Sequence, residues 1–481
     1  MLSVSRQEIT EGSLSRALVV LAVPLVAQNL VQVANQVVDI FWLGRLGEAA
    51  VAGVGLVIPV LGVIFAALFM AFVGTQTVVA QRVGAGDVTG ARLAATNGHV
   101  LALGLGLAAG AAGFLLAPAI VAAFDPGAAV HPYATRYLST FALGLPLIFL
   151  ADTAEASLVG VGDSRGSFLL NGLAVGLNVL LDPLLIFGLG PFPRLGVRGA
   201  ALATVIGYGA GFALAIGLFL RGRQELRLTR DALRADAGGI REIVDVGLPN
   251  TGQRVGQQSA RVVLIGIVSA VSGPAGLSAY TVGARVASIA FIPAQGLGQA
   301  AQSVVAQNLG ARAHDRARRA TWIGAAIAVG GLGIVGALQW FVPGPLTHLF
   351  VPDASPRGAA LTARYLRILA YGYPALGAVY LFAAGFNGAR RTRVTMVATL
   401  LQYWAVRVPI AVVGGIFAGA GVIAVFWAVT VSNIAGAAGS GLYYRHAAAD
   451  GMLVRAAARA GEAANVDPRD AMGTGTGGEN D

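Results

Sequence analysis

The sequence predicts an all-α polytopic membrane protein with twelve transmembrane helices, and three observations support this fold class. Hydrophobic residues make up 56% of the 481 residues and charged residues only 12%, whereas soluble domains carry about 25% charged residues. Apolar stretches recur along almost the whole chain at roughly 20 residues, the length that crosses a bilayer core of about 30 Å. The second half of the chain also repeats motifs of the first half.

The apolar segments, taken in chain order, divide into two sets of six. Hydropathy predicts helices at approximately these residues: 14–42, 51–75, 93–118, 136–160, 166–189, 196–220, 242–270, 276–305, 319–343, 361–385, 394–416 and 420–444. The longest polar break, 221–241, holds six Arg and three acidic residues and separates the two sets. We therefore expect an N-terminal six-helix lobe over 1–220, a cytoplasmic linker over 221–241 and a C-terminal six-helix lobe over 242–446. Residues 447–481 are rich in Ala, Gly and charge, which predicts a disordered cytoplasmic tail.

The two halves are copies of one another. QTVVAQRVGA at 76–85 matches QSVVAQNLGA at 302–311 at an offset of 226 residues. At an offset of 225, Pro24, Gln28 and Gln32 match Pro249, Gln253 and Gln257. A repeat of six helices returns the chain to the side of the membrane where it began. We therefore expect two parallel repeats around an axis along the membrane normal, enclosing a central cleft of the alternating-access type.

The basic residues, all 33 of them Arg, indicate the orientation. With the N-terminus inside, inner loops and termini hold roughly 21 Arg and outer loops roughly five, as the positive-inside rule requires. The net charge of +10 then follows from topology and implies no nucleic-acid partner. We expect a multi-pass protein of the plasma (inner) membrane, surrounded by lipid, with both termini cytoplasmic. It should act as a monomer, because one chain contains both lobes.

The first segment is too long and too polar for a cleaved signal peptide.

The residues that most enzymes need are missing from the sequence. It contains no Cys and no Lys, and its five His are scattered and form no HExxH pair. These absences exclude disulfides, Cys-ligated metals, a P-loop nucleotide site and a Schiff-base lysine. With no nucleophile–base pair, the chain is not expected to be an enzyme or to use a cofactor. A membrane receptor, which binds without net flux, is a further alternative.

Only four of the 23 acidic residues fall well inside the predicted helices, and all four lie in the first half: Asp39, Asp152, Glu155 and Asp182. A charge at the centre of a bilayer costs a few kcal/mol or more, so each of these side chains is a candidate functional group. The second half has no acidic residue at comparable depth.

Asp39 ends a polar stripe on the first helix. The stripe has spacings of 4, 3 and 4 and comprises Gln28, Gln32, Asn35 and Asp39. The fifth helix has a similar face with spacings of 7 and 4, made of Asn171, Asn178 and Asp182. Helical periodicity places each set on one side of its helix. Both Asp residues fall near the outer ends of their helices, and Thr204 falls near that depth on the sixth helix.

We expect one oxygen-rich cluster, formed by Asp39, Asn178, Asp182 and Thr204, that binds a coupling cation. Two carboxylates in a low dielectric require a shared proton or a cation between them. The same oxygens suit H⁺ and Na⁺, so the choice of ion stays open. The structural alternative is a hydrogen-bonded network that only fixes helix packing.

Asp152 and Glu155 lie one turn apart on the fourth helix, nearer the middle of the membrane. We expect them to line a substrate cavity, attracting a cationic substrate or relaying protons. The alternative is ion pairing with the buried Arg residues of the second half: Arg254, Arg261, Arg285 and Arg407. Pro24 lies inside the first helix, where proline permits a kink. Bending there would let cation binding at Asp39 change the conformation.

Several motifs together resemble the multidrug and toxic compound extrusion (MATE) family over roughly residues 10–446. They are LAVPLVAQNLVQVANQVVDIFWLGRLG, AQRVGAGD, GVGDSR, NVLLDPLLIFG followed by LGVRGAALAT, and PAQGLGQAAQSVVAQNLGA. The resemblance implies a V-shaped pair of six-helix bundles. It implies export of cationic, often amphipathic compounds in exchange for protons or sodium.

The resemblance also assigns residues. Asp39, Asn178, Asp182 and Thr204 fall on the amino-lobe cation site of the archaeal and DinF-like branch, which implies a possible Na⁺ site. The residues that fall on the substrate cavity of that lobe are Gln32, Asn35, Asp152 and Asn171. Pro24 falls on a proline implicated in bending. The sequence departs from the NorM-like branch, because it lacks carboxylates in the carboxyl lobe.

One alternative within the same superfamily is a flippase for a lipid-linked precursor. Such a protein would need a cationic cavity for a pyrophosphate group. The four buried Arg residues named above keep this alternative open, and it depends on whether they line the cleft.

Overall fold

Nearly all of the chain folds into helices in the computed structural model, which describes residues 6–124, 127–222, 226–227, 235–350 and 355–465. The first half contains α1 (Arg6–Thr10), α2 (Leu14–Gly44), α3 (Glu48–Ala85), α4 (Val88–Ala122), α5 (His131–Gly160), α6 (Ser164–Phe187) and α7 (Val197–Leu220). The second contains α8 (Ala237–Ala290), α9 (Ile292–Gly310), α10 (His314–Phe341), α11 (Pro343–Phe350), α12 (Pro356–Gly388), α13 (Thr392–Leu400), π-helical η3 (Leu401–Arg407), α14 (Val408–Val412), π-helical η4 (Val413–Phe417), α15 (Val422–Ala449) and α16 (Met452–Asn465).

Eleven helices of the described chain are long and apolar enough to cross a membrane, or up to twelve if a bent pair counts as one span. That pair, 276–290 with 292–310, is bent by 44°. Helix α8 continues through 271–275, where the sequence predicts a break between two segments. The expected linker is also shorter than predicted, because α8 already begins at Ala237. Residues 223–225 and 228–234 of that linker lie outside the described residues.

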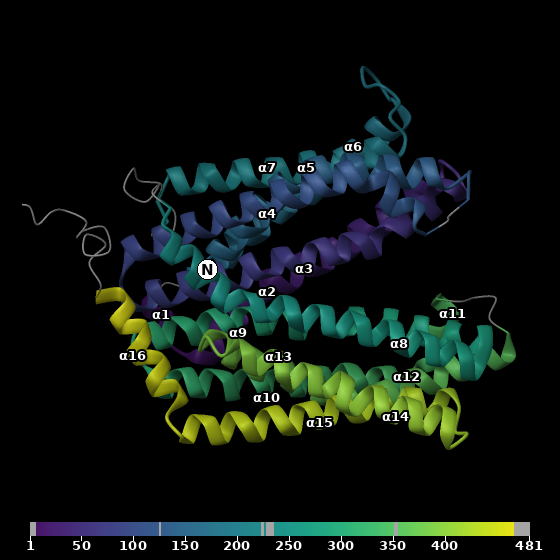
Figure 1. Ribbon diagram of the computed structural model, residues 1–481. Coiled ribbons are helices and arrows are strands. Elements are labelled where there is room, and N and C mark those ends of the chain that lie inside the picture. The colour runs from purple at the N-terminus through teal and green to yellow at the C-terminus, as the bar shows by residue number, and fades with distance from the viewer. Residues whose placement is uncertain (1–5, 125–126, 223–225, 228–234, 351–354, 466–481) are drawn as a thin grey trace, which may run out of the picture.

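The two halves form two bodies of helices (Figure 1). Within the first half, α4 packs on α5 and α6 on α7; within the second, α10 packs on α12 and α12 on α15. Contacts of α2 with α9 and of α3 with α8 and α9 join the halves. The bodies approach each other at the end where the N-terminus and α16 lie, here called the junction end. They diverge towards the opposite end, here called the far end.

The crossing of α3 and α9 at the junction end depends on two glycines from the repeated motif. A Cβ atom on Gly84 would lie 1.9 Å from the carbonyl oxygen of Gln307, and one on Gly310 would lie 2.0 Å from that of Gln81. Both pairs are related by the offset of 226 residues. Because only glycine permits such an approach, the repeat sets the distance between the two halves.

The glutamines of the same motif form hydrogen bonds across this crossing in both directions. Gln81 Nε2 donates to the carbonyl of Gly388, the last residue of α12, at 2.8 Å. Gln307 Nε2 donates to the carbonyl of Gly160, the last residue of α5, also at 2.8 Å. The glutamine of each motif therefore caps the C-terminal end of a helix in the opposite half. The sequence repeat corresponds to a structural pseudo-two-fold contact.

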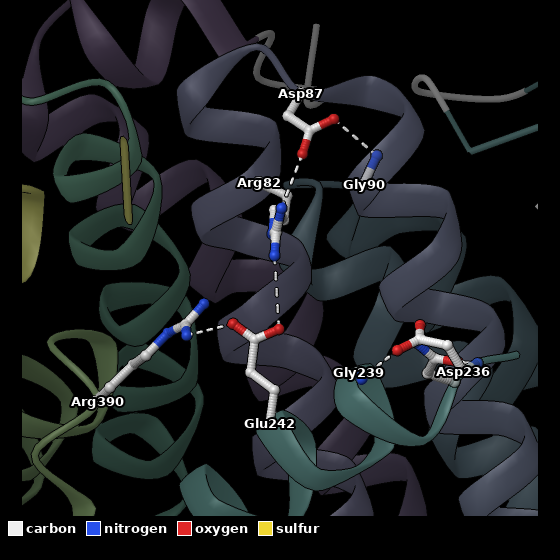
Figure 2. A network of polar contacts seen from close by, with 8 residues as sticks. Arg82, Asp87, Gly90, Asp236, Gly239, Glu242 and Arg390 are labelled. Carbon is white, nitrogen blue, oxygen red and sulfur yellow. Dashed lines mark hydrogen bonds and ion pairs between the residues drawn. The ribbon is translucent and has the colours of Figure 1, made fainter. Parts of the chain in front are cut away.

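Ion pairs at the junction end connect α3, α8 and the residues after α12 (Figure 2). Glu242 of α8 lies between two guanidinium groups, those of Arg82 on α3 and Arg390 after α12. Arg82 also pairs with Asp87 at 3.0 Å. Glu242 thus connects the first half to the second through charge as well as packing.

Several helices begin with an acidic or hydroxyl cap followed three residues later by Gly. Asp87, Asp163 and Asp236 accept hydrogen bonds from the N–H groups of Gly90, Gly166 and Gly239 at 2.7–2.9 Å. Such caps satisfy the free N–H groups at a helix start. Burial raises the pKa of Asp236, but hydrogen bonds from Gly239 and Asn97 outweigh burial and hold it below its ordinary value.

The C-terminal tail differs from the sequence prediction. Residues 452–465 form α16, which packs against α3, α9, α10 and α15 at the junction end. The prediction of a tail disordered from 447 is therefore wrong for this segment, and 466–481 lie outside the described residues. The buried residues recur at helical spacing: Met452, Leu453, Ala456, Ala457 and Ala460. Composition alone does not reveal that this segment is an amphipathic helix, because Ala is common on both of its faces.

We predict opposite effects of the same substitution at two glycines of α3. Gly84→Ala should lower the stability of the detergent-solubilised protein by about 1–3 kcal/mol, because its methyl group meets the backbone of Gln307. Gly55→Ala is the matched control, since a Cβ there meets nothing within 4 Å, and it should be neutral or stabilise by up to about 1 kcal/mol. Thermal unfolding measures both, and equal effects would contradict the role of the glycine crossing.

Candidate functional site

The polar stripe of α2 faces the polar stripe of α6. Gln32 Nε2 donates to Asn171 Oδ1 at 3.1 Å, and Asn35 Nδ2 donates to Asn178 Oδ1 at 2.8 Å. The spacings of 4, 3 and 4 on α2 and of 7 and 4 on α6 keep these side chains in register as the two helices pack together. The structure therefore brings together the two faces that the sequence singles out.

Towards the far end this interface carries an oxygen-rich cluster made of Asp39, Asn178, Asp182 and Thr204, which we call the carboxylate cluster. The carboxyl groups of Asp39 and Asp182 lie within hydrogen-bonding reach of each other. Asn178 Nδ2 donates to Asp182 Oδ1 and to Thr204 Oγ1, each at 3.3 Å. Asp182 has no exposed surface and Asn178 is only 3% exposed.

Several oxygens in this region lack a donor from the described residues. They are buried acceptors: Asn35 Oδ1, Asp39 Oδ1 and Asp182 Oδ2. A buried acceptor without a donor is costly, and a buried carboxylate more so. Two carboxylates and neutral amide and hydroxyl oxygens form a donor set that suits a hard cation such as Na⁺, or a proton shared by the carboxyls. The residues present therefore fit a monovalent cation.

Tyr137 of α5 is a neighbour of the carboxylate cluster that the sequence analysis missed. It lies close enough to Asp39 and Asp182 for its phenol to interact electrostatically with both. Its ring stacks on Phe141 at a centroid distance of 5.9 Å. No polar periodicity on α5 points to this tyrosine, so only the packing of α5 against α6 and α7 could reveal it.

Glu155 lies nearer the junction end in a network of neutral donors. Its Oε1 accepts from Gln28 Nε2 at 2.7 Å, and its Oε2 accepts from Asn171 Nδ2 at 2.9 Å. Ser167 Oγ donates to Gln28 Oε1 at 2.8 Å. Gln299 of α9 also reaches Glu155, so the second half of the chain contributes to the network. Glu155 is 6% exposed and its carboxylate is well satisfied.

Asp152 differs from Glu155 although it lies only one turn away. It makes no hydrogen bond to the described part of the chain and faces a small cavity. The lining residues of this cavity are Ala151, Asp152, Glu155, Leu170, Asn171, Ala174, Tyr208 and Gly211. The cavity volume is about 10 Å³, which is about the space that one water molecule needs. In this conformation it has room for water or an ion beside Asp152.

The alternative in which Asp152 and Glu155 pair with buried Arg residues is wrong for the described residues. No ion pair between described residues includes Asp152, Glu155 or any of the four Arg candidates. Glu155 uses amide and hydroxyl donors instead. Three contributors to this region were not predicted as site residues, although Gln28 belongs to the predicted stripe: Gln28, Ser167 and Gln299.

Pro24 is buried within α2, which runs without a break from Leu14 to Gly44. The following turn lies against α9, where a Cβ atom on Gly296 would lie 2.6 Å from Val26. Pro24 thus occupies the part of α2 that contacts the second half, whereas Asp39 occupies the part near the far end.

Known proteins resemble the chain over most of its length. The MatE family matches residues 24–184 and 249–413, one block in each half. An FAD transporter of Shewanella oneidensis is 25% identical over 412 residues, which cover 85% of this chain and 90% of the relative. A probable multidrug resistance protein NorM of Thermotoga maritima is 26% identical over 411 residues, which cover 85% of this chain and 87% of the relative.

A solved structure has the same fold. A MOP superfamily transporter from Pyrococcus furiosus superposes with a TM-score of 0.87 and covers 94% of this chain and 99% of its own. Its sequence is 23% identical, so the likeness concerns the fold alone. Together with the apolar helices, it confirms the predicted all-α membrane fold.

We predict that the two carboxylates of α5 respond differently to neutralisation. Glu155→Gln should destabilise the protein by about 1–3 kcal/mol, because an amide N–H₂ would face the donors of Gln28 or Asn171. Asp152→Asn should leave stability unchanged or raise it, because its carboxylate has no donor to lose. Thermal unfolding of the two purified variants measures the difference, and a larger loss for Asp152→Asn would reverse the assignment.

Proposed function

The chain belongs to the MatE family, and we propose that it is a secondary active antiporter that exports cationic, amphipathic compounds in exchange for H⁺ or Na⁺. Members of this family are transporters and not enzymes, which agrees with the missing nucleophile–base pairs. The multidrug resistance name of the Thermotoga maritima relative supports multidrug efflux. The expected resemblance to the MATE family is confirmed, whereas the archaeal and DinF-like branch stays a prediction.

The carboxylate cluster is the observation that carries this proposal. Asp39 and Asp182 lie within hydrogen-bonding reach of each other, and each keeps a buried oxygen without a donor. Two like charges in such a position repel unless a cation neutralises one of them. The stability of this arrangement therefore depends on a bound cation, as a coupling site requires.

Antiport follows if the cation and the substrate favour opposite states of the transporter. In our proposal the cation enters the carboxylate cluster from the far end and stabilises one arrangement of α2 and α6. The substrate cavity is formed by Gln32, Asn35, Asp152, Glu155 and Asn171. Cation binding would reshape this cavity through the hydrogen bonds that join Asn35 to Asn178 and Gln32 to Asn171. Pro24 would allow α2 to bend as the cation binds.

The orientation and surroundings of the protein are part of the same proposal. The excess of Arg at the junction end supports a cytoplasmic location for this end and for both termini. We propose a monomer in the plasma (inner) membrane that contacts lipid, uses no cofactor besides its coupling ion and binds no nucleic acid.

A lipid-linked precursor flippase is the second candidate function. It is favoured by the position of Arg254, whose guanidinium lies 3.4 Å from the ring centroid of Phe69 on α3, and so lies between the two halves. Only Arg407 of the four is buried, and the expectation of burial is wrong for the exposed Arg254, Arg261 and Arg285. The carboxylate cluster has no evident part in pyrophosphate binding, and we therefore prefer the antiporter.

Transport of the cationic dye rhodamine 123 by liposomes containing the purified protein tests the proposal. We expect either a proton gradient or a sodium gradient to drive the dye, and the effective gradient identifies the coupling ion. In Asp39→Asn, gradient-driven flux should fall to the level of empty liposomes, because the cation site has lost a charge.

Asp245→Asn is the matched control, since Asp245 is an exposed acidic residue near the start of α8; it should transport like the wild type. Full gradient-driven flux in Asp39→Asn would move coupling to Asp152 and Glu155. Absence of dye flux in folded wild type under both gradients would favour the flippase.

A further inference from the structure

The second half contains a group of positive charges with no negative partner. Between Asp245 and Asp315, and between Asp353 and Asp450, the sequence has no acidic residue. Four Arg residues of α8 and η3 lie in these stretches, and three of them make up this group: Arg254, Arg261 and Arg407. None of them forms an ion pair with the described residues. A guanidinium at membrane depth without a counter-charge is costly and indicates a functional site.

These Arg residues gather around two tyrosines, and we call the five residues the guanidinium cluster. Arg407 and Arg261 both lie within hydrogen-bonding reach of the Tyr403 hydroxyl. The guanidinium of Arg407 lies 3.9 Å from the centroid of the Tyr403 ring. Tyr380 interacts electrostatically with Arg254, Arg261 and Tyr403. The guanidinium groups of the second half therefore lie beside aromatic rings and phenol groups.

Neutral partners hold Arg407 in place. Its Nε donates to Ser432 Oγ at 2.7 Å and its Nη2 to Asn433 Oδ1 at 2.6 Å. Gln402 Nε2 donates to the same Asn433 oxygen at 2.9 Å. Arg407 is only 6% exposed. These contacts fix the orientation of the guanidinium but leave its charge uncompensated.

The internal repeat relates the guanidinium cluster to the carboxylate cluster. Arg407 stands 225 residues after Asp182, and the N-caps of α7 and α15, Gly196 and Gly421, correspond at the same offset. The neighbouring prolines, Pro183 and Pro409, correspond at 226. To within one residue, the second half therefore has a cation where the first has a carboxylate. At the position equivalent to Asp39 it has buried Leu264.

The helix that carries Arg407 also changes locally from α-helical to π-helical geometry. Residues 401–407 form the π-helical segment η3, which contains Gln402, Tyr403 and Arg407, whereas the equivalent helix α6 is α-helical throughout. π-helical turns inside α-helices are frequently found at functional sites. In this segment Arg407 donates to α15, whereas the Trp404 indole donates to the carbonyl of Gly256 on α8 at 2.9 Å.

We infer that the guanidinium cluster is a binding subsite for the oxyanion of an aromatic substrate, a carboxylate or a phosphate. This inference rests on the proposed transport function and adds a second charge requirement to it. Planar guanidinium groups bind such oxyanions through paired N–H donors, and Tyr380 and Tyr403 offer ring faces for the aromatic part. Arg254, in contact with Phe69, places the subsite where the two halves face each other.

Equilibrium binding to the purified full-length protein tests this subsite, with fluorescein and rhodamine 123 as probes. The two dyes share a xanthene ring, but fluorescein is anionic and rhodamine 123 is cationic. Fluorescence anisotropy should show binding of both. Arg261→Gln and Arg407→Gln should each weaken fluorescein binding about tenfold or more, as expected for a charged hydrogen bond, and leave rhodamine 123 binding within about twofold.

Two variants control for folding and for general charge effects. Arg261 is exposed, so Arg261→Gln should fold even if Arg407→Gln does not. Arg285→Gln removes an exposed charge from α8 outside the cluster, and it should bind both dyes like the wild type. An equal effect of Arg261→Gln on both dyes, or no effect on fluorescein, would overturn the oxyanion subsite. Neither result would affect ion-driven export of rhodamine 123, so the proposed function is tested separately.

Competition in nanodiscs distinguishes two sources of the oxyanion. Displacement of fluorescein by soluble 4-nitrophenyl phosphate, in discs of neutral lipid, would support a free aromatic solute. Displacement by phosphatidylglycerol in the disc, without an effect of the soluble phosphate, would support a lipid headgroup at the same subsite. Failure of both to compete would overturn the assignment of oxyanion binding to this cluster.

Discussion

A charge inside an apolar bilayer needs hydrogen-bond partners or an opposite charge, because water cannot solvate it there. Glu155 meets this requirement with fixed amide donors from Gln28 and Asn171. Asp39 and Asp182 do not, since each keeps an acceptor without a donor. The positive charge of Arg407 also has no acidic partner within the described chain. The Glu155 network stabilises the fold locally. The Asp39–Asp182 pair needs a positively charged ligand, and Arg407 needs a negatively charged one.

The glycine crossing of α3 and α9 determines how these charges meet. Gly84 and Gly310 hold the halves in backbone contact at the junction end, and Glu242 adds an ionic connection there. The repeat then places one cluster in each half, the carboxylate cluster in the first and the guanidinium cluster in the second. Motion about this crossing would change the distance between the carboxylate and guanidinium clusters. In our proposal a substrate with both an amine and an oxyanion responds to that distance, and the coupling ion competes for the carboxylates.

Sequence reasoning predicted most of the fold, because spans and repeats depend on hydropathy and local motifs. It also placed Asp39, Asn178 and Asp182 on facing helix surfaces, since helical spacing alone fixes those faces. It could not show that Glu155 is satisfied while Asp152 is not, because their neighbours come from α2, α6 and α9. Tyr137 and the η3 segment leave no periodic signal. The helix at 452–465 was missed because composition concealed its apolar face.

The most direct test of the central claim is substrate-driven ion movement in sealed liposomes that contain the purified protein. Ethidium trapped inside would be allowed to leave down its gradient while entry of protons and of ²²Na⁺ is followed with no ion gradient imposed. We expect one of the two ions to accumulate inside during dye exit, and no accumulation in Asp182→Asn. Dye exit through the wild-type protein without movement of either ion would contradict exchange at the carboxylate cluster.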